Sequence, residues 1–151
     1  MFLINLILMS EIEFLIRMLL AVILGGIIGY EREINHKPAG LRTHMLVCLG
    51  SCIFMIVSMK FDVDPARVAA GVVSGIGFIG AGTIIAEKQK EKEIVHGITT
   101  AAGLWATAGI GLLVGIGEYF LAVTAALIVA CILWLRITKK RFSFREVVNK
   151  V

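Results

Sequence analysis

The sequence predicts an all-α membrane protein: a polytopic bundle of about five short, glycine-rich transmembrane helices in a single domain over residues 1–151. With 58% hydrophobic residues and a mean hydropathy of +0.92, the chain is too apolar to hide its side chains in one soluble core. Its charged residues, 17% of the chain, gather in short stretches between apolar runs. That pattern is typical of loops between membrane spans.

Five apolar runs give the expected helices, at about residues 12–30, 44–59, 66–86, 97–115 and 119–135. Polar segments separate them, including an Asp64-Pro65 turn and a charged loop from Glu87 to Glu93. A basic tail follows at residues 136–151. Residues 1–11 lack the positive start of a cleaved signal peptide, so we expect them to be retained, either on or in the membrane.

The distribution of Lys and Arg predicts the orientation. With five spans, one side of the membrane receives only Lys60 and Arg67, while the other receives Arg32, Lys37, Arg42, Lys88, Lys90, Lys92 and the tail. Because short loops rich in these residues stay in the cytoplasm, we expect the N-terminus outside and the C-terminus in the cytoplasm. The basic segments favour anionic lipid headgroups as partners, and their lack of interleaved aromatic residues argues against nucleic acid.

Small residues at every fourth position predict where the helices pack. Lipid gives helices no hydrophobic reason to associate, so close backbone approach must supply the attraction. The expected packing positions are Ala21, Gly25, Gly29, Gly71, Gly75, Gly103, Thr107 and Gly111. An alternative stays open, since glycines also expose backbone carbonyls to ions in membrane proteins.

Arg17 and Asp64 are candidate functional residues toward the outer side. Arg17 is the one unambiguous charge inside a span, and it either has a function or extends its stem to the outer headgroups. Asp64 precedes Pro65 and is suited to capping the third helix. It can also pair with Arg17 or bind a cation, and we expect the pair with Arg17 to form.

Three segments should converge on the inner side: residues 31–33, 38–44 and 96–100. Their mixed charges indicate either a solvated rim or an ion-pair network, because Glu31 and Arg42 lie close to apolar spans. Glu31 and Asp64 are weak candidates for binding Mg²⁺, and no other cofactor is expected. Trp105 lies in the middle of the fourth span, and we expect it to pack within the bundle. The sequence contains none of the common catalytic motifs, so we expect no enzyme.

Several ordered motifs resemble the MgtC/SapB family over about residues 14–135. They are residues 17–21 (RMLLA), 29–33 (GYERE), 38–43 (PAGLRT), 75–82 (GIGFIGAG) and 97–105 (GITTAAGLW). The resemblance implies a bacterial inner-membrane protein linked to survival at low magnesium and, in pathogens, to virulence. Members of this family are implicated in restraining the ATP synthase and are not established as magnesium transporters. The resemblance places this chain with the shorter members that lack a C-terminal soluble domain. The motif positions that it implies are Arg17, Glu31, Arg32, Arg42, Thr43, Asp64, Arg67, Thr99, Thr100 and Trp105.

Two functions follow as the main hypotheses, beside a third, a lipid- or small-molecule-binding membrane protein, which the sequence neither supports nor excludes. The first is a non-enzymatic membrane regulator in magnesium, acid or energy homeostasis, which contacts a second copy of itself or a membrane complex such as the ATP synthase. The second is a transporter or channel for Mg²⁺ or another cation. Mg²⁺ would want several oxygen ligands, and acidic residues occur only near the ends of the spans.

Overall fold

A computed structural model describes residues 2–60, 64–89 and 92–135; the basic tail lies outside the described residues. The described chain contains five helices and one two-stranded hairpin. In order, these are α1 (Phe2–Ile34), α2 (Leu41–Lys60), α3 (Pro65–Ala81), β1 (Ile85–Gln89), β2 (Lys92–His96), α4 (Ile98–Ile116) and α5 (Tyr119–Trp134).

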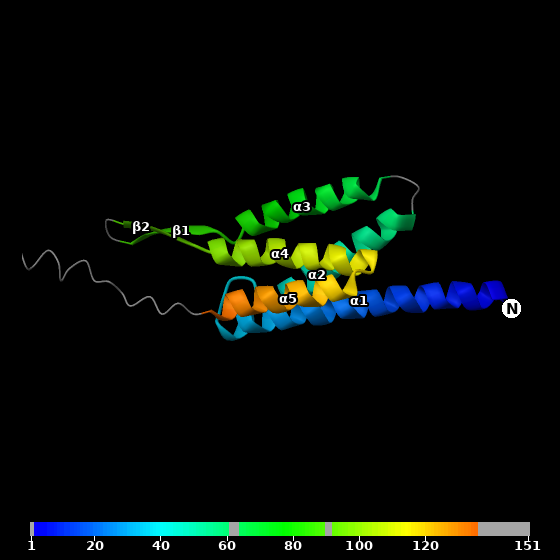
Figure 1. The fold of residues 1–151 in the computed structure, drawn as a ribbon. Helices are drawn as coiled ribbons and strands as arrows, with labels where there is room; N and C mark the ends of the chain where they lie inside the picture. The colour runs from blue at the N-terminus through cyan, green and yellow to red at the C-terminus, as the bar shows by residue number, and fades with distance from the viewer. Residues whose placement is uncertain (1, 61–63, 90–91, 136–151) are drawn as a thin grey trace, which may run out of the picture.

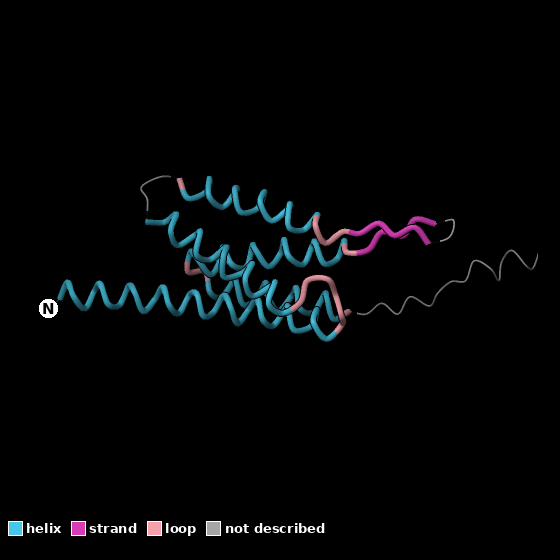
Figure 2. The backbone as a smooth tube through the Cα atoms, turned by 180° about the vertical axis from the view of Figure 1, so that it is seen from behind, coloured by secondary structure: helices cyan, strands magenta, loops and turns pink. Residues whose placement is uncertain are grey.

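The helices run side by side, and α2 packs against both α1 and α4 (Figure 1). Helix α5 packs against α1 and α4, whereas α3 lies on the far side of α4 from α1 (Figure 1). The α1–α2 turn, the hairpin and the end of α5 lie together at what we call the hairpin end. The end of α2, the start of α3 and the α4–α5 turn lie at the opposite end, where α1 projects beyond the other helices (Figure 2).

Three helical segments are long and apolar enough to cross a membrane: Glu11–Ile34, Leu41–Lys60 and Ile98–Ile116. Helices α3 and α5 are also apolar but have 17 and 16 residues. At 1.5 Å per residue they are roughly 25 Å long, somewhat less than the hydrocarbon core of about 30 Å. The chain is therefore an all-α membrane protein, while its orientation and its number of crossings stay predictions.

Glycines bring α1 and α4 directly against the backbone of α2. A Cβ atom at Gly25 would lie 2.6 Å from the carbonyl oxygen of His44, and one at Gly29 would lie 2.8 Å from Leu41 Cα. On α4, a Cβ at Gly111 would lie 2.8 Å from Ser51 Cβ. Ala21 and Thr107, two further predicted packing positions, are fully buried. The helices thus meet backbone to backbone around α2.

The structure corrects the predicted packing positions on α3. Among the described residues, no other side chain or distant backbone atom lies within 4 Å of a Cβ position at Gly71 or Gly75, so neither glycine is at a contact between described helices. Helix α3 instead approaches α4 through Gly80, whose Cβ position lies 3.4 Å from Ala101 Cβ, and buries Ile76 beside Leu104. The spacing of small residues does not distinguish a packed face from an open one.

The third helix is shorter than predicted, because residues 82–86 leave it. The last helical hydrogen bond runs from the Gly82 amide to the Phe78 carbonyl. The Thr83 amide and hydroxyl then both donate to the Gly80 carbonyl, the hydroxyl at 2.8 Å, and this tighter turn ends the helix. Residues 85–89 and 92–96 then form an antiparallel hairpin where a charged loop was expected, with Ile85 opposite His96. Gly97 follows at φ 97°, and a Cβ there would collide with the Thr83 carbonyl oxygen, so this turn requires glycine.

Two glycines of α4 give a matched test of this packing. We expect Gly111→Ala to lower stability in detergent by about 1–3 kcal/mol, because the added methyl must displace Cys48 and Ser51. Gly109→Ala, with open space around its Cβ position, should be neutral or stabilising by about 0.5–1 kcal/mol, because alanine favours the helix. Thermal melts measure both. Equal effects of the two substitutions would contradict the packing.

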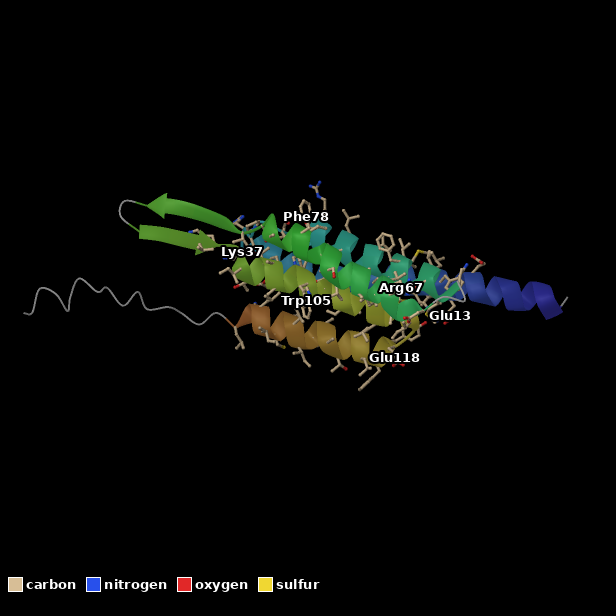
Figure 3. The ribbon with its side chains drawn as sticks, turned by 90° about the horizontal axis from the view of Figure 1, so that it is seen from above. Glu13, Lys37, Arg67, Phe78, Trp105 and Glu118 are labelled. Carbon is tan, nitrogen blue, oxygen red and sulfur yellow. The ribbon has the colours of Figure 1, made fainter. Side chains whose placement is uncertain are left out.

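The predicted orientation can be tested at two exposed positions at opposite ends of the bundle, Lys37 and Glu118 (Figure 3). In a background without native cysteines, an impermeant thiol reagent added to intact cells should label Glu118→Cys and spare Lys37→Cys. Permeabilised cells should show labelling of both. Labelling of Lys37→Cys in intact cells would contradict the prediction, because it would mean that the orientation is reversed or that the number of crossings differs.

Candidate functional site

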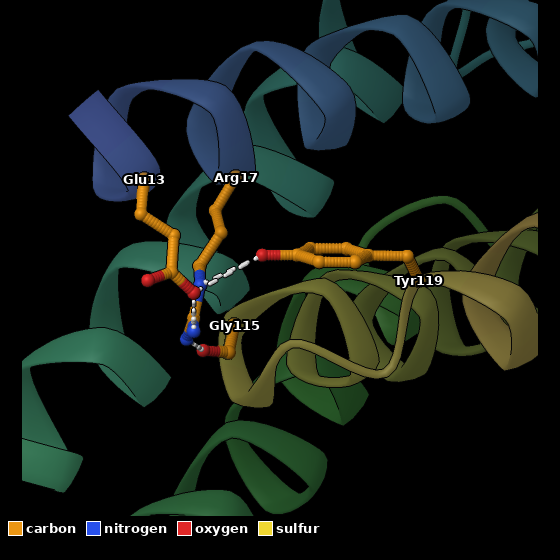
Figure 4. Close-up of polar contacts among 4 residues, drawn as sticks. All are labelled: Glu13, Arg17, Gly115 and Tyr119. Atoms are coloured by element: carbon orange, nitrogen blue, oxygen red, sulfur yellow. Dashed lines mark hydrogen bonds and ion pairs between the residues drawn. The ribbon is translucent and has the colours of Figure 1, made fainter. Parts of the chain in front are cut away.

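Arg17 joins three helices at the opposite end of the bundle (Figure 4). Its Nη1 donates to the Gly115 carbonyl at 2.6 Å, and its Nε donates to the Tyr119 hydroxyl at 3.2 Å. Its Nη2 forms an ion pair with Glu13 one turn earlier on α1. The Arg17 side chain is only 12% exposed, although Glu13 is half exposed. We call Glu13, Arg17, Gly115 and Tyr119 the Arg17 cluster.

The Arg17 cluster provides a hydrogen-bond donor for a free backbone carbonyl at the C-terminal end of α4. The last four carbonyls of a helix lack intrahelical partners, and the C-terminal end carries partial negative charge, so a cation is favoured there. Gly117 ends α4 in the left-handed conformation, with φ 89°, and α5 begins two residues later. The guanidinium therefore holds the α4–α5 turn against α1.

The expected pair between Arg17 and Asp64 is not formed. Asp64 is exposed and caps α3, accepting a hydrogen bond from the Ala66 amide at 3.0 Å. Of the three roles considered for Asp64, which are a helix cap, a partner of Arg17 and a cation ligand, the structure contains the cap. The distribution of basic residues along the sequence correctly predicts that Arg17 and Asp64 lie at the same end of the bundle. It does not predict which helices are neighbours at that end.

Sequence reasoning missed Glu13 and Tyr119 as partners of Arg17. The spacing of Glu13 and Arg17 at i, i+4 on one helix was a usable signal for their ion pair. No local signal identifies Tyr119, which lies 102 residues away from Arg17 along the chain.

A second polar group lies at the hairpin end and contains Glu31, Arg32, Asn35, Gly40 and His44, which we call the hairpin-end cluster. Arg32 is 4% exposed, and its Nη1 lies 3.2 Å from a carboxylate oxygen of Glu31. Asn35 donates to the other carboxylate oxygen at 2.5 Å and to the Glu31 carbonyl at 2.8 Å. The ion-pair network considered for this side thus includes Glu31 and Arg32, whereas Arg42 is exposed.

His44 is fully buried at the start of α2. Its Nδ1 lies 3.0 Å from the Gly40 carbonyl oxygen, which fixes Nδ1 as the protonated nitrogen. Its Nε2 has no hydrogen-bond partner among the described residues and lies 3.7 Å from a Cβ position at Gly103 of α4. The start of α2 therefore packs against both the last part of α1 and α4 here, while the predicted convergence with residues 96–100 stays a prediction.

Other predicted site residues are dispersed. Trp105 is 58% exposed, so the expectation that it packs within the bundle is wrong: it lies on a face of α4 away from α2 (Figure 3). Thr100 is buried, whereas Thr99 and Arg67 are exposed. Thr43 borders a groove between α2 and α3.

The two weak metal candidates cannot share one ion. Glu31 belongs to the hairpin-end cluster, and Asp64 caps α3 at the opposite end. Among the described residues, no group of three or more His, Cys, Asp or Glu side chains is placed to hold a metal. The carboxylates of Glu13, Glu31 and Asp64 instead bind Arg17, Arg32 and Asn35, and the start of α3.

The model of the MgtC family matches residues 18–142 of the chain. The chain belongs to the MgtC family.

Relatives of this MgtC-family chain cover most of it. It is 45% identical over 131 residues to "Putative magnesium transporter YhiD" of Escherichia coli, which covers 80% of the chain and 59% of that protein. It is 44% identical over 124 residues to "Protein MgtC" of Salmonella typhimurium, covering 82% of the chain and 52% of that protein. The chain therefore spans about half to three fifths of these relatives. No solved structure was found to match it.

A double-mutant cycle tests the Arg17 cluster. Arg17→Ala and Tyr119→Phe should each destabilise the protein, and the double mutant should lose about 0.5–1 kcal/mol less than the sum, because the two side chains share a hydrogen bond. Asp64→Ala should cost about 0.5–2 kcal/mol through its lost cap. The destabilisations caused by Asp64→Ala and Arg17→Ala should be additive within about 0.5 kcal/mol.

Thermal or denaturant melts in detergent measure all of these variants. Coupling between Arg17 and Asp64, together with additivity between Arg17 and Tyr119, would restore the pair that the sequence predicted.

Proposed function

We propose that this chain is a non-catalytic regulator of the bacterial inner membrane that acts in magnesium, acid or energy homeostasis through helix contacts with a membrane partner. The family and its magnesium-related names support the physiological setting. The packing between the two polar clusters supports a regulator over a channel, and it is the observation that carries the proposal.

Between the Arg17 cluster and the hairpin-end cluster, the centre of the bundle is filled by direct helix contacts. Gly25 and Gly111 bring α1 and α4 against successive turns of α2. Ile28, Cys48, Cys52 and Val114 are fully buried among these helices. A hydrated path for a cation needs a ring of carbonyls or charged side chains, and these positions supply apolar atoms.

The rival function is transport of Mg²⁺, for which the printed name of the Escherichia coli relative is the specific support. Mg²⁺ keeps several waters and prefers carboxylate oxygens in octahedral geometry. In this chain the carboxylates of Glu13, Glu31 and Asp64 are engaged at the two ends of the bundle.

An outward aromatic side chain supports a partner surface. The indole of Trp105 is exposed on α4, and its N–H makes no hydrogen bond with a described residue. A buried or lipid-facing indole N–H is more stable with an acceptor, and tryptophan is enriched at the energetic centres of interfaces. We therefore place the partner contact at Trp105, with a second copy or a larger complex such as the ATP synthase as the occupant.

The partner contact can be tested by gentle purification from the native membrane. Trp105→Leu should lower the yield of co-purified partner at least severalfold and leave the melting temperature of the chain unchanged, because the residue packs outside the core. Trp134→Leu, at the other exposed tryptophan, which lies at the end of α5, is the control and should retain the partner. Equal recovery from both variants would remove Trp105 from the interface.

Ion flux separates the two functions. Vesicles that contain the purified protein should take up Mg²⁺ no faster than empty vesicles, with an added ionophore as the positive control. Saturable, protein-dependent uptake that is lost in Asp64→Ala would favour the transporter.

A further inference from the structure

A groove with a volume of about 750 Å³ lies between α2 and α3. Three glycines line it, Gly50, Gly71 and Gly75, and their Cβ positions have open space within 4 Å. Larger side chains on the two helices, Leu46 and Phe54 among them, complete the lining. This volume falls in the range of about 300–1,000 Å³ that is usual for small-molecule sites.

We propose that this α2–α3 groove binds one acyl chain of an anionic phospholipid, whose phosphate binds Arg42 and Thr43 at the hairpin end.

The lining favours a hydrocarbon chain. Of the described residues that line it, only Thr43 and Ser51 have polar side chains, and the Ser51 hydroxyl already donates to the Val47 carbonyl at 2.8 Å. Leu46 and Phe54 are more than half exposed, so the groove opens on the outer surface of the bundle. For a membrane protein the surrounding solvent at such a surface is the acyl chains of the bilayer.

A basic residue directly precedes the first lining residue on each helix, Arg42 before Thr43 on α2 and Arg67 before Val68 on α3. Arg42 precedes Leu46 and Gly50 on one i, i+4 ridge of α2, and Arg67 precedes Gly71 and Gly75 in the same way on α3. Side chains on a helix lean toward its N-terminus, and α2 and α3 begin at opposite ends of the bundle. The two arginines therefore mark the two ends of the groove, as phosphates mark the two faces of a hydrocarbon layer.

The hairpin end offers the better headgroup site. Thr43 adds a hydroxyl to the lining there, directly after Arg42, and neither side chain is hydrogen-bonded to a described residue. Lys37 is exposed at the same end and adds positive charge (Figure 3). At the other end, the lining residue next to Arg67 is Val68, which has no donor.

Native mass spectrometry tests the proposal on the full chain. The protein is exchanged with vesicles of phosphatidylglycerol and phosphatidylcholine in equal parts, extracted in mild detergent and weighed with its bound lipid. We expect one phosphatidylglycerol per chain. Gly71→Leu and Gly75→Leu should each weaken its retention about tenfold by filling the groove. Gly77→Leu is the control, since this glycine lies in equally open space on α3 but outside the lining.

The headgroup has its own pair of variants. Arg42→Gln should reduce the preference for phosphatidylglycerol over phosphatidylcholine, whereas Arg67→Gln should leave that preference unchanged. Unaltered retention in Gly71→Leu and Gly75→Leu, with melting temperatures that show folded protein, would overturn the proposal. Disulfide-linked dimers of Gly75→Cys without bound phospholipid would also overturn it, because a helix of a second copy would then occupy the groove.

Discussion

The close approach of α1 and α4 to the backbone of α2 is the constraint on which the rest of the structure depends. Within a bilayer, neighbouring lipid is as apolar as leucine, so helices gain from association only through tight contact. Gly25 and Gly29 provide this contact on α1, and Gly111 and Gly115 provide it on α4, each pair spaced by one turn. Larger side chains at these glycines would push α1, α2 and α4 apart. Both polar clusters lie at the ends of these helices.

The polar clusters follow from that arrangement. Once α1, α2 and α4 are packed, the backbone groups at the helix ends must find partners, and charged side chains at the ends supply them. Arg17 binds the last turn of α4, and Glu33 accepts a hydrogen bond from the Leu41 amide at the start of α2, 3.0 Å away. Helix α3 stands outside this arrangement and contacts α4 through few large side chains, which leaves the α2–α3 groove. The space between α1, α2 and α4 is filled, and the α2–α3 groove and Trp105 lie outside it.

The sequence predicted the five helices because apolar runs and polar turns are local features. The bounds of α4 and α5 differ from the prediction by one residue at most, whereas α1 begins at Phe2, well before the predicted start at about residue 12. The sequence also predicted Gly25, Gly29 and Gly111 as packing positions, and all three lie at helix contacts in the structure. Which faces meet is a property of the whole bundle, however. The same spacing at Gly71 and Gly75 is open, Trp105 points outward, and Arg17 binds Tyr119 in place of Asp64. The hairpin was missed because Ile84 and Ile85 extend an apolar run that looks helical, although branched residues of this kind also favour strands.

The central claim is that the space between α1, α2 and α4 is closed to water, and two native residues report on it directly. Cys48 and Cys52 are fully buried in the middle of α2, facing these neighbours. The decisive measurement is the reaction of these two thiols with a small, cationic, water-soluble methanethiosulfonate reagent in the folded protein, in a Cys131→Ser background. The account predicts that neither thiol is modified until the protein is unfolded in strong detergent, when both react. Modification of either thiol in the folded protein would reveal a hydrated path through the bundle and contradict the account.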